Sequence, residues 1–200
     1  DETKVSTLFA FDNHSIPFTR SLEMNLNKPE KYPGNPIVPL GKKGEADEWA
    51  VQFYGSVIRE KGKFRMWYAA LDGARGQSPE HNSSLWRPAY AESTDGVNWV
   101  KPKLGLVEYK GNKDNKLLLF EPALGPINVK VLHEPEERDP SRQYKMATHV
   151  YWLKGGDKRH GTLVPYASAD GLRWRSLVPV TPNNAELPED QLVLPPMHIE

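Results

Sequence analysis

The chain has 200 residues, with 26 basic and 26 acidic side chains, so it carries no net charge at neutral pH. This balance removes the electrostatic basis for binding nucleic acid or an anionic membrane surface, because phosphate groups attract a surplus of Lys and Arg. The absence of cysteine excludes disulfide bonds and thiolate metal sites, and no apolar run approaches the roughly 18 residues that a membrane-spanning helix needs.

The N-terminal residues, Asp1-Glu2-Thr3-Lys4, include no methionine, no basic segment and no apolar segment. We therefore expect a processed terminus from which any secretion signal has been removed, and a periplasmic or secreted protein.

The composition favours many short strands joined by turns, with 18 Pro, 15 Gly, 6 Trp, 8 Tyr and 6 Phe. The best helix candidate, Gly44 to Val51, is short and leads directly into strand-like sequence. An all-β fold is predicted. Turn residues such as Asp72-Gly73 separate the predicted strands, which cover residues 51–60, 63–71, 87–95, 115–123, 127–135, 142–153 and 162–170.

One pattern occurs twice, as "YAESTDGVNW" at 90–99 and "YASADGLRW" at 166–174. Similar segments, "FRM" at 64–66 and "YKM" at 144–146, precede the two copies by one strand, and the repeat spacing is about 75 to 80 residues. The Asp-Gly pair predicts a tight turn in which Asp binds backbone amides and Gly takes a positive φ. We interpret the pattern as architecture, with each tryptophan folded back onto its own sheet, rather than as a catalytic motif.

A repeat of this length that contains several short strands is typical of a β-propeller blade with loop insertions. The sequence therefore predicts one partial propeller domain. Its predicted parts are an N-terminal strand and lead-in at 1–34, blade one at 35–110, blade two at 111–180, and the start of a third blade at 181–200.

Four segments resemble a known family: "NPIVP" (35–39), "YGSVIREKGKFRMWYAA" (54–70), "YAESTDGVNWVKPKLGLVEYKGNKDNKLLL" (90–119) and "DPSRQYKM" (139–146). Together they are similar to bacterial proteins related to the N-terminal domain of family 32 glycoside hydrolases. Those proteins belong with the five-bladed β-propeller enzymes, which include invertases, levansucrases and arabinanases. The resemblance implies a pocket on the propeller axis whose carboxylates cleave a glycosidic bond by acid/base catalysis.

A complete five-bladed ring would need roughly 350 to 400 residues. Two open blades would also leave long sheet edges uncovered. We therefore expect the remaining blades to come from the same longer protein or from a partner chain.

The family's nucleophile motif, Trp-Met-Asn-Asp-Pro-Asn-Gly, matches residues 49–55 at its first and last positions only. Gln52 stands where the nucleophilic Asp is expected, and glutamine cannot act as that nucleophile. Asp47 and Glu48 are the nearest carboxylates and become catalytic candidates; the alternative is that they form a solvated, charged turn.

Two further acidic candidates come from the resemblance. The triplet Arg138-Asp139-Pro140 is similar to a family motif whose Asp stabilises the transition state, although Asp139 could equally cap a charged hairpin. The segment "LPPMHIE" resembles the approach to the general acid, which makes Glu200 the candidate for that role; the alternative is a frayed terminal residue.

The predicted substrate-binding residues are aromatic, amide and imidazole side chains on or near the innermost strands. Aromatic rings pack against the apolar faces of sugars, and amide and imidazole groups bind hydroxyls. The set comprises Trp49, Gln52, Tyr54, Asn128, His149 and His198.

The expected function is that of a glycoside hydrolase acting on an oligo- or polysaccharide. A non-catalytic carbohydrate-binding propeller is the alternative that Gln52 favours, and an interaction propeller that binds protein through its rims is the third hypothesis. No cofactor is expected, because the histidines lack the spacing of a zinc site; an axial calcium ion is implied by the resemblance alone.

Overall fold

The computed structural model describes residues 20–21, 28–73, 86–123, 126–153 and 159–178. The chain divides into two units, residues 1–35 and 36–200, and the strands all belong to the second. Within the described ranges, the short 3-10 helix η2 (Pro140–Arg142) is the one helical element. The all-β class is therefore confirmed. No helix in these ranges is long and apolar enough to cross a membrane.

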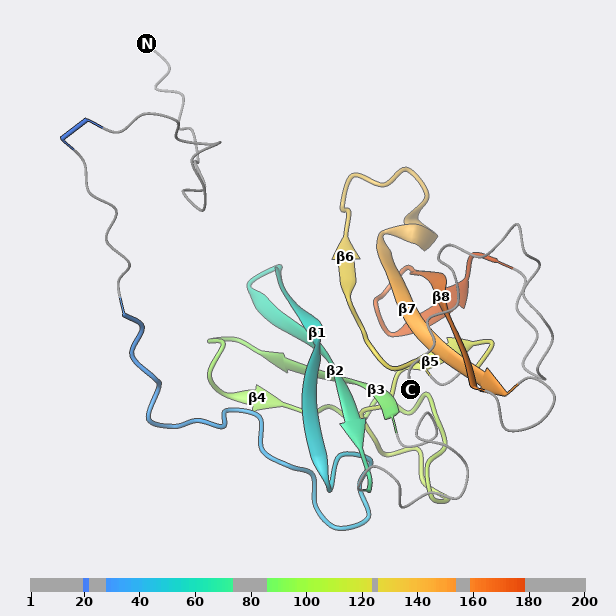
Figure 1. Ribbon diagram of the computed structural model, residues 1–200, viewed down its shortest axis with the longest axis horizontal. Coiled ribbons are helices and arrows are strands. Elements are labelled where there is room, and N and C mark those ends of the chain that lie inside the picture. The colour runs from blue at the N-terminus through green and yellow to red at the C-terminus, as the bar shows by residue number, and fades with distance from the viewer. Residues whose placement is uncertain (1–19, 22–27, 74–85, 124–125, 154–158, 179–200) are drawn as a thin grey trace. The chain divides into compact units, whose positions relative to one another are not determined.

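The first sheet contains four antiparallel strands in chain order: β1 (Ala50–Glu60), β2 (Lys63–Leu71), β3 (Trp86–Ser93) and β4 (Trp99–Val100) (Figure 1). A two-residue turn joins β1 to β2. Both of its residues, Lys61 and Gly62, have positive φ, which suits the right-handed twist of a tight hairpin. The helix candidate at 44–51 is not helical; it forms turns and the beginning of β1.

The second sheet repeats this design with β6 (Val131–His133), β7 (Tyr144–Leu153), β8 (Arg159–Ser168) and β9 (Arg173–Ser176), each antiparallel to the next (Figure 1). A fifth strand, β5 (Leu119–Glu121), pairs in parallel with β9 at the outer edge. The loop between β6 and β7 contains η2.

The first copy of the repeated pattern forms the turn between β3 and β4. Ser93 Oγ accepts hydrogen bonds from the amides of Asp95 (3.2 Å) and Gly96 (2.9 Å). Asp95 Oδ1 accepts from the amides two and three residues further on, at 2.8 and 2.7 Å. The Trp99 indole N–H then donates to the Gly96 carbonyl at 3.0 Å, so the ring folds back over the turn.

The second copy forms the turn between β8 and β9 with the same set of bonds. Ser168 Oγ accepts from the amides of Asp170 (3.2 Å) and Gly171 (2.8 Å), and Trp174 Nε1 donates to the Gly171 carbonyl at 3.1 Å. Gly171 has φ +73°, and Gly96 has φ +78°. The repeated Ser, Asp, Gly and Trp residues each make a bond within their own turn, which supports the predicted structural role of the repeat.

Burial raises the pKa of Asp170, but backbone and side-chain hydrogen bonds from Arg173, Leu172 and Ser168 outweigh it and hold that pKa below its usual value. Hydrogen bonds from Asn98, Val97 and Ser93 lower the pKa of Asp95 in the same way. Both carboxylates are committed to their turns as ionised acceptors.

The two sheets pack through unlike faces. The core between them contains Trp67 from β2 together with Met146 from β7 and Trp174 from β9. Met66 and Trp99 are the equivalents of Met146 and Trp174 in the first sheet, and they belong to a separate core on its other face. The face of the second sheet that carries Met146 and Trp174 therefore packs against the first sheet. The corresponding face of the first sheet, which carries Met66 and Trp99, packs against other segments of the chain.

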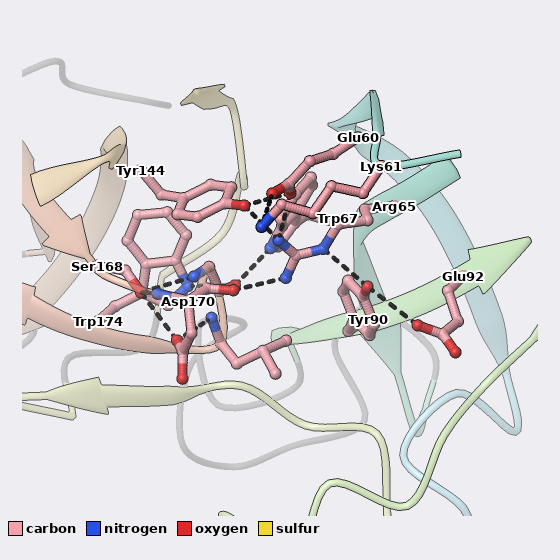
Figure 2. Close-up of polar contacts among 12 residues, drawn as sticks. Glu60, Lys61, Arg65, Trp67, Tyr90, Glu92, Tyr144, Ser168, Asp170 and Trp174 are labelled. Atoms are coloured by element: carbon pink, nitrogen blue, oxygen red, sulfur yellow. Dashed lines mark hydrogen bonds and ion pairs between the residues drawn. The ribbon is translucent and has the colours of Figure 1, made fainter. Parts of the chain in front are cut away.

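Arg65, on β2, joins the two sheets (Figure 2). Its Nε donates to Tyr90 Oη at 2.9 Å, its Nη1 to Glu60 (3.0 Å) and to Tyr144 Oη (2.6 Å), and its Nη2 to the Asp170 carbonyl (2.5 Å). Four guanidinium bonds are thus already made within the protein, so we interpret this cluster as structural. Trp67 adds a parallel link, since its indole N–H donates to the Gly171 carbonyl at 2.6 Å.

Candidate functional site

A bulge in β1 exposes two adjacent aromatic side chains. The pairing between β1 and β2 shifts between Gln52 and Ser56, and the Phe53 and Tyr54 side chains are 57% and 52% exposed. Neighbouring residues of a regular strand point to opposite faces, whereas a bulge re-aims them. The Tyr54 ring stacks on Trp86 of β3 with the ring centroids 5.6 Å apart. We call Phe53, Tyr54 and Trp86 the aromatic platform.

Gly55 allows this bulge to form. It is buried, and a Cβ atom at this position would lie 1.7 Å from the Trp67 carbonyl oxygen on β2. Only a residue without a side chain lets the two backbones approach so closely.

The segment before β6 runs beside the bulge and brings the second sheet to the platform. The Val129 amide donates to the Tyr54 carbonyl at 2.8 Å, and the Val131 amide donates to Ser56 Oγ at 2.9 Å. Lys130 Nζ donates to the Gly55 carbonyl at 3.0 Å and lies 5.7 Å from the centre of the Phe53 ring. A cationic group that can bind hydroxyls therefore lies beside the platform.

Asn128 lies on the segment before β6, and His149 lies on β7. Asn128 Oδ1 accepts from the His149 amide at 2.7 Å and from Thr148 Oγ1 at 3.1 Å, which fixes the orientation of its side-chain amide. Burial lowers the pKa of His149, so the imidazole is neutral at pH 7 and has both a donor and an acceptor nitrogen.

Gln52 lies on β1 just before the bulge. Its Oε1 atom is buried and has no hydrogen-bond partner among the described residues. Buried acceptors in folded proteins almost always find a donor, so this one suits an ordered water or a ligand hydroxyl. Four of the predicted substrate-binding residues, Gln52, Tyr54, Asn128 and His149, are thus placed around one bulge and the segment that pairs with it.

Trp49 is half-exposed immediately before β1, and its amide donates to the Leu71 carbonyl at 3.1 Å. His198 and Glu200, the remaining predicted site residues near the C-terminus, lie outside the described residues. Their roles stay predictions.

Asp47 lies within an interior ionic cluster. Its fully buried carboxylate accepts from Tyr68 Oη at 3.0 Å, from Lys101 Nζ at 2.5 Å and from Lys116 Nζ at 2.6 Å. Burial raises its pKa, but the two lysines outweigh that effect, so the net pKa is lowered and the group stays ionised. Glu48 accepts from the Gly44 amide and pairs with Lys110 at 3.5 Å. The catalytic role proposed for these two residues is a prediction that this geometry does not test.

Asp139 begins η2. Its Oδ1 accepts from the amide of Ser141 (2.9 Å) and from the Ser141 hydroxyl (2.6 Å), and these bonds lower its pKa. This is the capping geometry expected of a turn residue. Asp139 also borders a cavity of about 460 Å³ over β5, β8 and β9, which the side chains of Arg142, Arg173 and Arg175 line as well.

Asp72 is a candidate that the sequence reading missed, because Asp72-Gly73 reads as an ordinary turn. Its Oδ2 accepts from Tyr109 Oη at 2.5 Å and lies 3.4 Å from Arg87 Nη2, while its Oδ1 is buried without a hydrogen-bond partner among the described residues. It directly follows Leu71, which pairs with Ala50 and with Trp86. Asp72 therefore lies at the platform end of the first sheet.

Within the described ranges, no group of three or more His, Asp or Glu side chains could hold a metal ion. The calcium ion implied by the family resemblance stays an expectation.

No known family model matches the chain, and no curated protein matches it either. One similar solved structure is a protein from Parabacteroides distasonis described as a "putative glycoside hydrolase". The two share 16% sequence identity with a TM-score of 0.32; the alignment covers 75% of this chain and 59% of that protein. The chain thus spans less than two thirds of that protein's length. A TM-score of this size does not establish a shared fold, so the proposals below stand on the geometry of the described residues.

Proposed function

We propose that the chain supplies two adjacent blades and a sugar-binding surface to a β-propeller of the glycoside hydrolase type. The observation that carries the proposal is the aromatic platform, in which Phe53 and Tyr54 of the bulged edge strand β1 and Trp86 of β3 lie beside the fixed amide of Asn128. Exposed rings next to an oriented amide group suit a sugar, which presents an apolar C–H face and a rim of hydroxyls.

The packing of the two sheets supports the propeller. In a β-sandwich, two sheets bury their inner faces against each other. Here the Trp67 face of the first sheet packs against the Met146 face of the second sheet. Met66 is the equivalent of Met146 in the first sheet, and it lies on the face opposite to Trp67. Such a head-to-tail relation generates a ring when the rotation closes. The first strands of both sheets, β1 and β6, are also joined through the Val131 amide and Ser56.

Replacing Tyr54 with Ala should weaken glycan binding by about 10-fold, the equivalent of about 1.4 kcal/mol, because the ring stack on Trp86 is lost. Titration calorimetry with a panel of neutral and acidic oligosaccharides would measure this. Tyr32→Ala is the matched control, since Tyr32 is also 52% exposed. Equal losses in both variants, or no glycan bound by the unmodified protein, would contradict the proposal.

Hydrolysis of the bound glycan is the second candidate function, and Asp72 is the observation that favours it. One of its oxygens is held by the Tyr109 hydroxyl, while the other has no donor among the described residues, so the carboxylate is oriented and keeps an acceptor for a ligand. Glycosidic cleavage needs two carboxyl groups, one as acid and one as base or nucleophile. Asp72 would be the base or nucleophile, and the predicted acid, Glu200, would have to supply the second carboxyl group.

If Asp72 is catalytic, Asp72→Asn should slow the release of reducing ends by at least about 100-fold while leaving glycan affinity intact. The control is Asp114→Asn, which removes an exposed carboxylate paired with Lys103. A protein that binds a glycan and releases no reducing ends from it would be a carbohydrate-binding module instead. Unchanged hydrolysis in Asp72→Asn would remove Asp72 from the reaction.

A further inference from the structure

A cavity of about 470 Å³ lies beside the segments that contain residues 43–46 and 101–116, separate from the aromatic platform. Although the whole chain is electrically neutral, this cavity is bordered by five lysines and only two carboxylates. The lysines are Lys43, Lys101, Lys103, Lys110 and Lys116; the carboxylates are those of Glu45 and Asp114.

The charges around the cavity do not cancel. Besides the two bordering carboxylates, Asp47 pairs with Lys101 and Lys116, and Glu48 pairs with Lys110. Asp72 also acts on Lys110, but it pairs with Arg87 at 3.4 Å, so four carboxylates are left to balance five ammonium groups. Lys43 is the lysine of this set that makes no ion pair with any described residue, so one positive charge remains uncompensated.

Two of the lysines retain unused donor capacity close to the cavity. Lys101 Nζ donates to the Pro39 carbonyl and to Asp47, and Lys116 Nζ donates to Glu45 and Asp47. An ammonium group has three N–H donors, so each of these two keeps one uncommitted. The Lys116 side chain is only 5% exposed, so its charge is poorly screened by water.

We propose that this cavity binds a single oxyanion group, the carboxylate, sulfate or phosphate that would balance its excess positive charge. Charge-assisted hydrogen bonds from ammonium groups to such oxygens are the strong ones in proteins. The cavity volume lies in the usual range for small-ligand sites, roughly 300 to 1,000 Å³. The group could be borne by an acidic sugar or be a free inorganic anion, and the two sources share this chemistry.

Titration calorimetry at fixed ionic strength with inorganic phosphate, glucuronate and glucose tests the site. Phosphate and glucuronate should give saturable heats, while glucose should give none. Higher affinity for glucuronate than for phosphate identifies a sugar-borne group, and the reverse order identifies a free anion. Absence of saturable binding by either anion, or equal binding of glucose, would overturn the proposal.

Lys43→Gln should weaken anion binding by about 10-fold, because it removes the unpaired charge. Lys61→Gln is the matched control, since Lys61 is 89% exposed in the turn between β1 and β2. Lys43 and the control lie on the surface, so both variants should fold. An unchanged affinity of Lys43→Gln for phosphate and glucuronate would also contradict the proposed anion site. The site does not depend on the proposed sugar surface: Tyr54→Ala should bind these anions normally even if the platform proposal fails.

Discussion

Replacing Asp47 with Asn should lower the free energy of unfolding by about 3 to 5 kcal/mol, the cost of breaking a buried ion pair by removing one partner. The amide nearly preserves the shape of the side chain and still accepts from Tyr68, but it leaves the ammonium groups of Lys101 and Lys116 without the charge they share. Urea denaturation with an unchanged m-value would measure the loss.

Asp114→Asn is the control for this experiment. Its carboxylate also pairs with a lysine, Lys103, but the side chain is 62% exposed, and such surface pairs contribute about 0 to 1 kcal/mol. Equal destabilisation by the two substitutions would show that the burial of Asp47 does not matter. A stable Asp47→Asn protein that has lost only hydrolysis would instead support the catalytic role predicted for this residue.

The same carboxylate should make stability depend on pH. Its pKa in the folded protein lies below the ordinary value of 3.8, because the two lysines outweigh the effect of burial. A group of this kind stabilises the fold fully above its unfolded pKa, and the contribution is lost as pH falls through the folded pKa. The unmodified protein should therefore lose stability more steeply below about pH 4 than Asp47→Asn does.

Arg65→Met should cost about 3 to 5 kcal/mol, because it leaves the largely buried Glu60 carboxylate with only the exposed Lys61 as a cation and removes four bonds, two of which reach the second sheet. Arg65→Lys should recover only part of this loss. A lysine carries its donors on one nitrogen and cannot reproduce the fork that spans Tyr90, Glu60 and Asp170. Thermal unfolding of both variants would show whether Arg65→Met loses more stability than Arg65→Lys.

Tyr144 depends on the same cluster. Burial and the hydrogen bond that its hydroxyl donates to Glu60 raise the pKa of Tyr144 to about 12, and the hydroxyl accepts from Arg65 Nη1. Arg59→Met is the matched control, since Arg59 lies on β1, makes no ion pair with a described residue, and has its guanidinium 5.7 Å from the centre of the Phe64 ring. A loss in Arg59→Met equal to that in Arg65→Met would contradict the view that Arg65 clamps the two sheets.

The strand pattern was predictable from local sequence. The expected strand at 63–71 has the same bounds as β2, and the one at 51–60 differs from β1 by a single residue. The short strands β4 and β9 were not predicted as strands of their own, because each is only a few residues long and contains the turn tryptophan itself. A strand that short has no periodicity to detect, and it exists because the turn returns the chain to its neighbour.

The candidate site was predictable in part. Gln52 and Tyr54 came from the family motif, Asn128 from the alignment of the two repeats, and His149 from its place in a predicted strand. The four residues lie around the β1 bulge, and their binding role stays a prediction. The partnership of Tyr54 with Trp86 had no sequence signal, because it depends on the register between β1, β2 and β3. The surroundings of the carboxylates had no sequence signal either. Asp47 is fully buried, and Asp72 is bound by the Tyr109 hydroxyl.

By itself, the sequence determined the all-β class, the turns and the repeat, since hydrogen bonds such as those of Ser168 and Asp170 reach only two or three residues along the chain. Tertiary structure decided which side chains the bulge exposes, that Asp47 is enclosed by lysines 54 and 69 positions away, and that Arg65 binds a carbonyl 105 positions away. Those contacts depend on strand register and on how one sheet packs against the next, and neither is encoded within a few neighbouring residues.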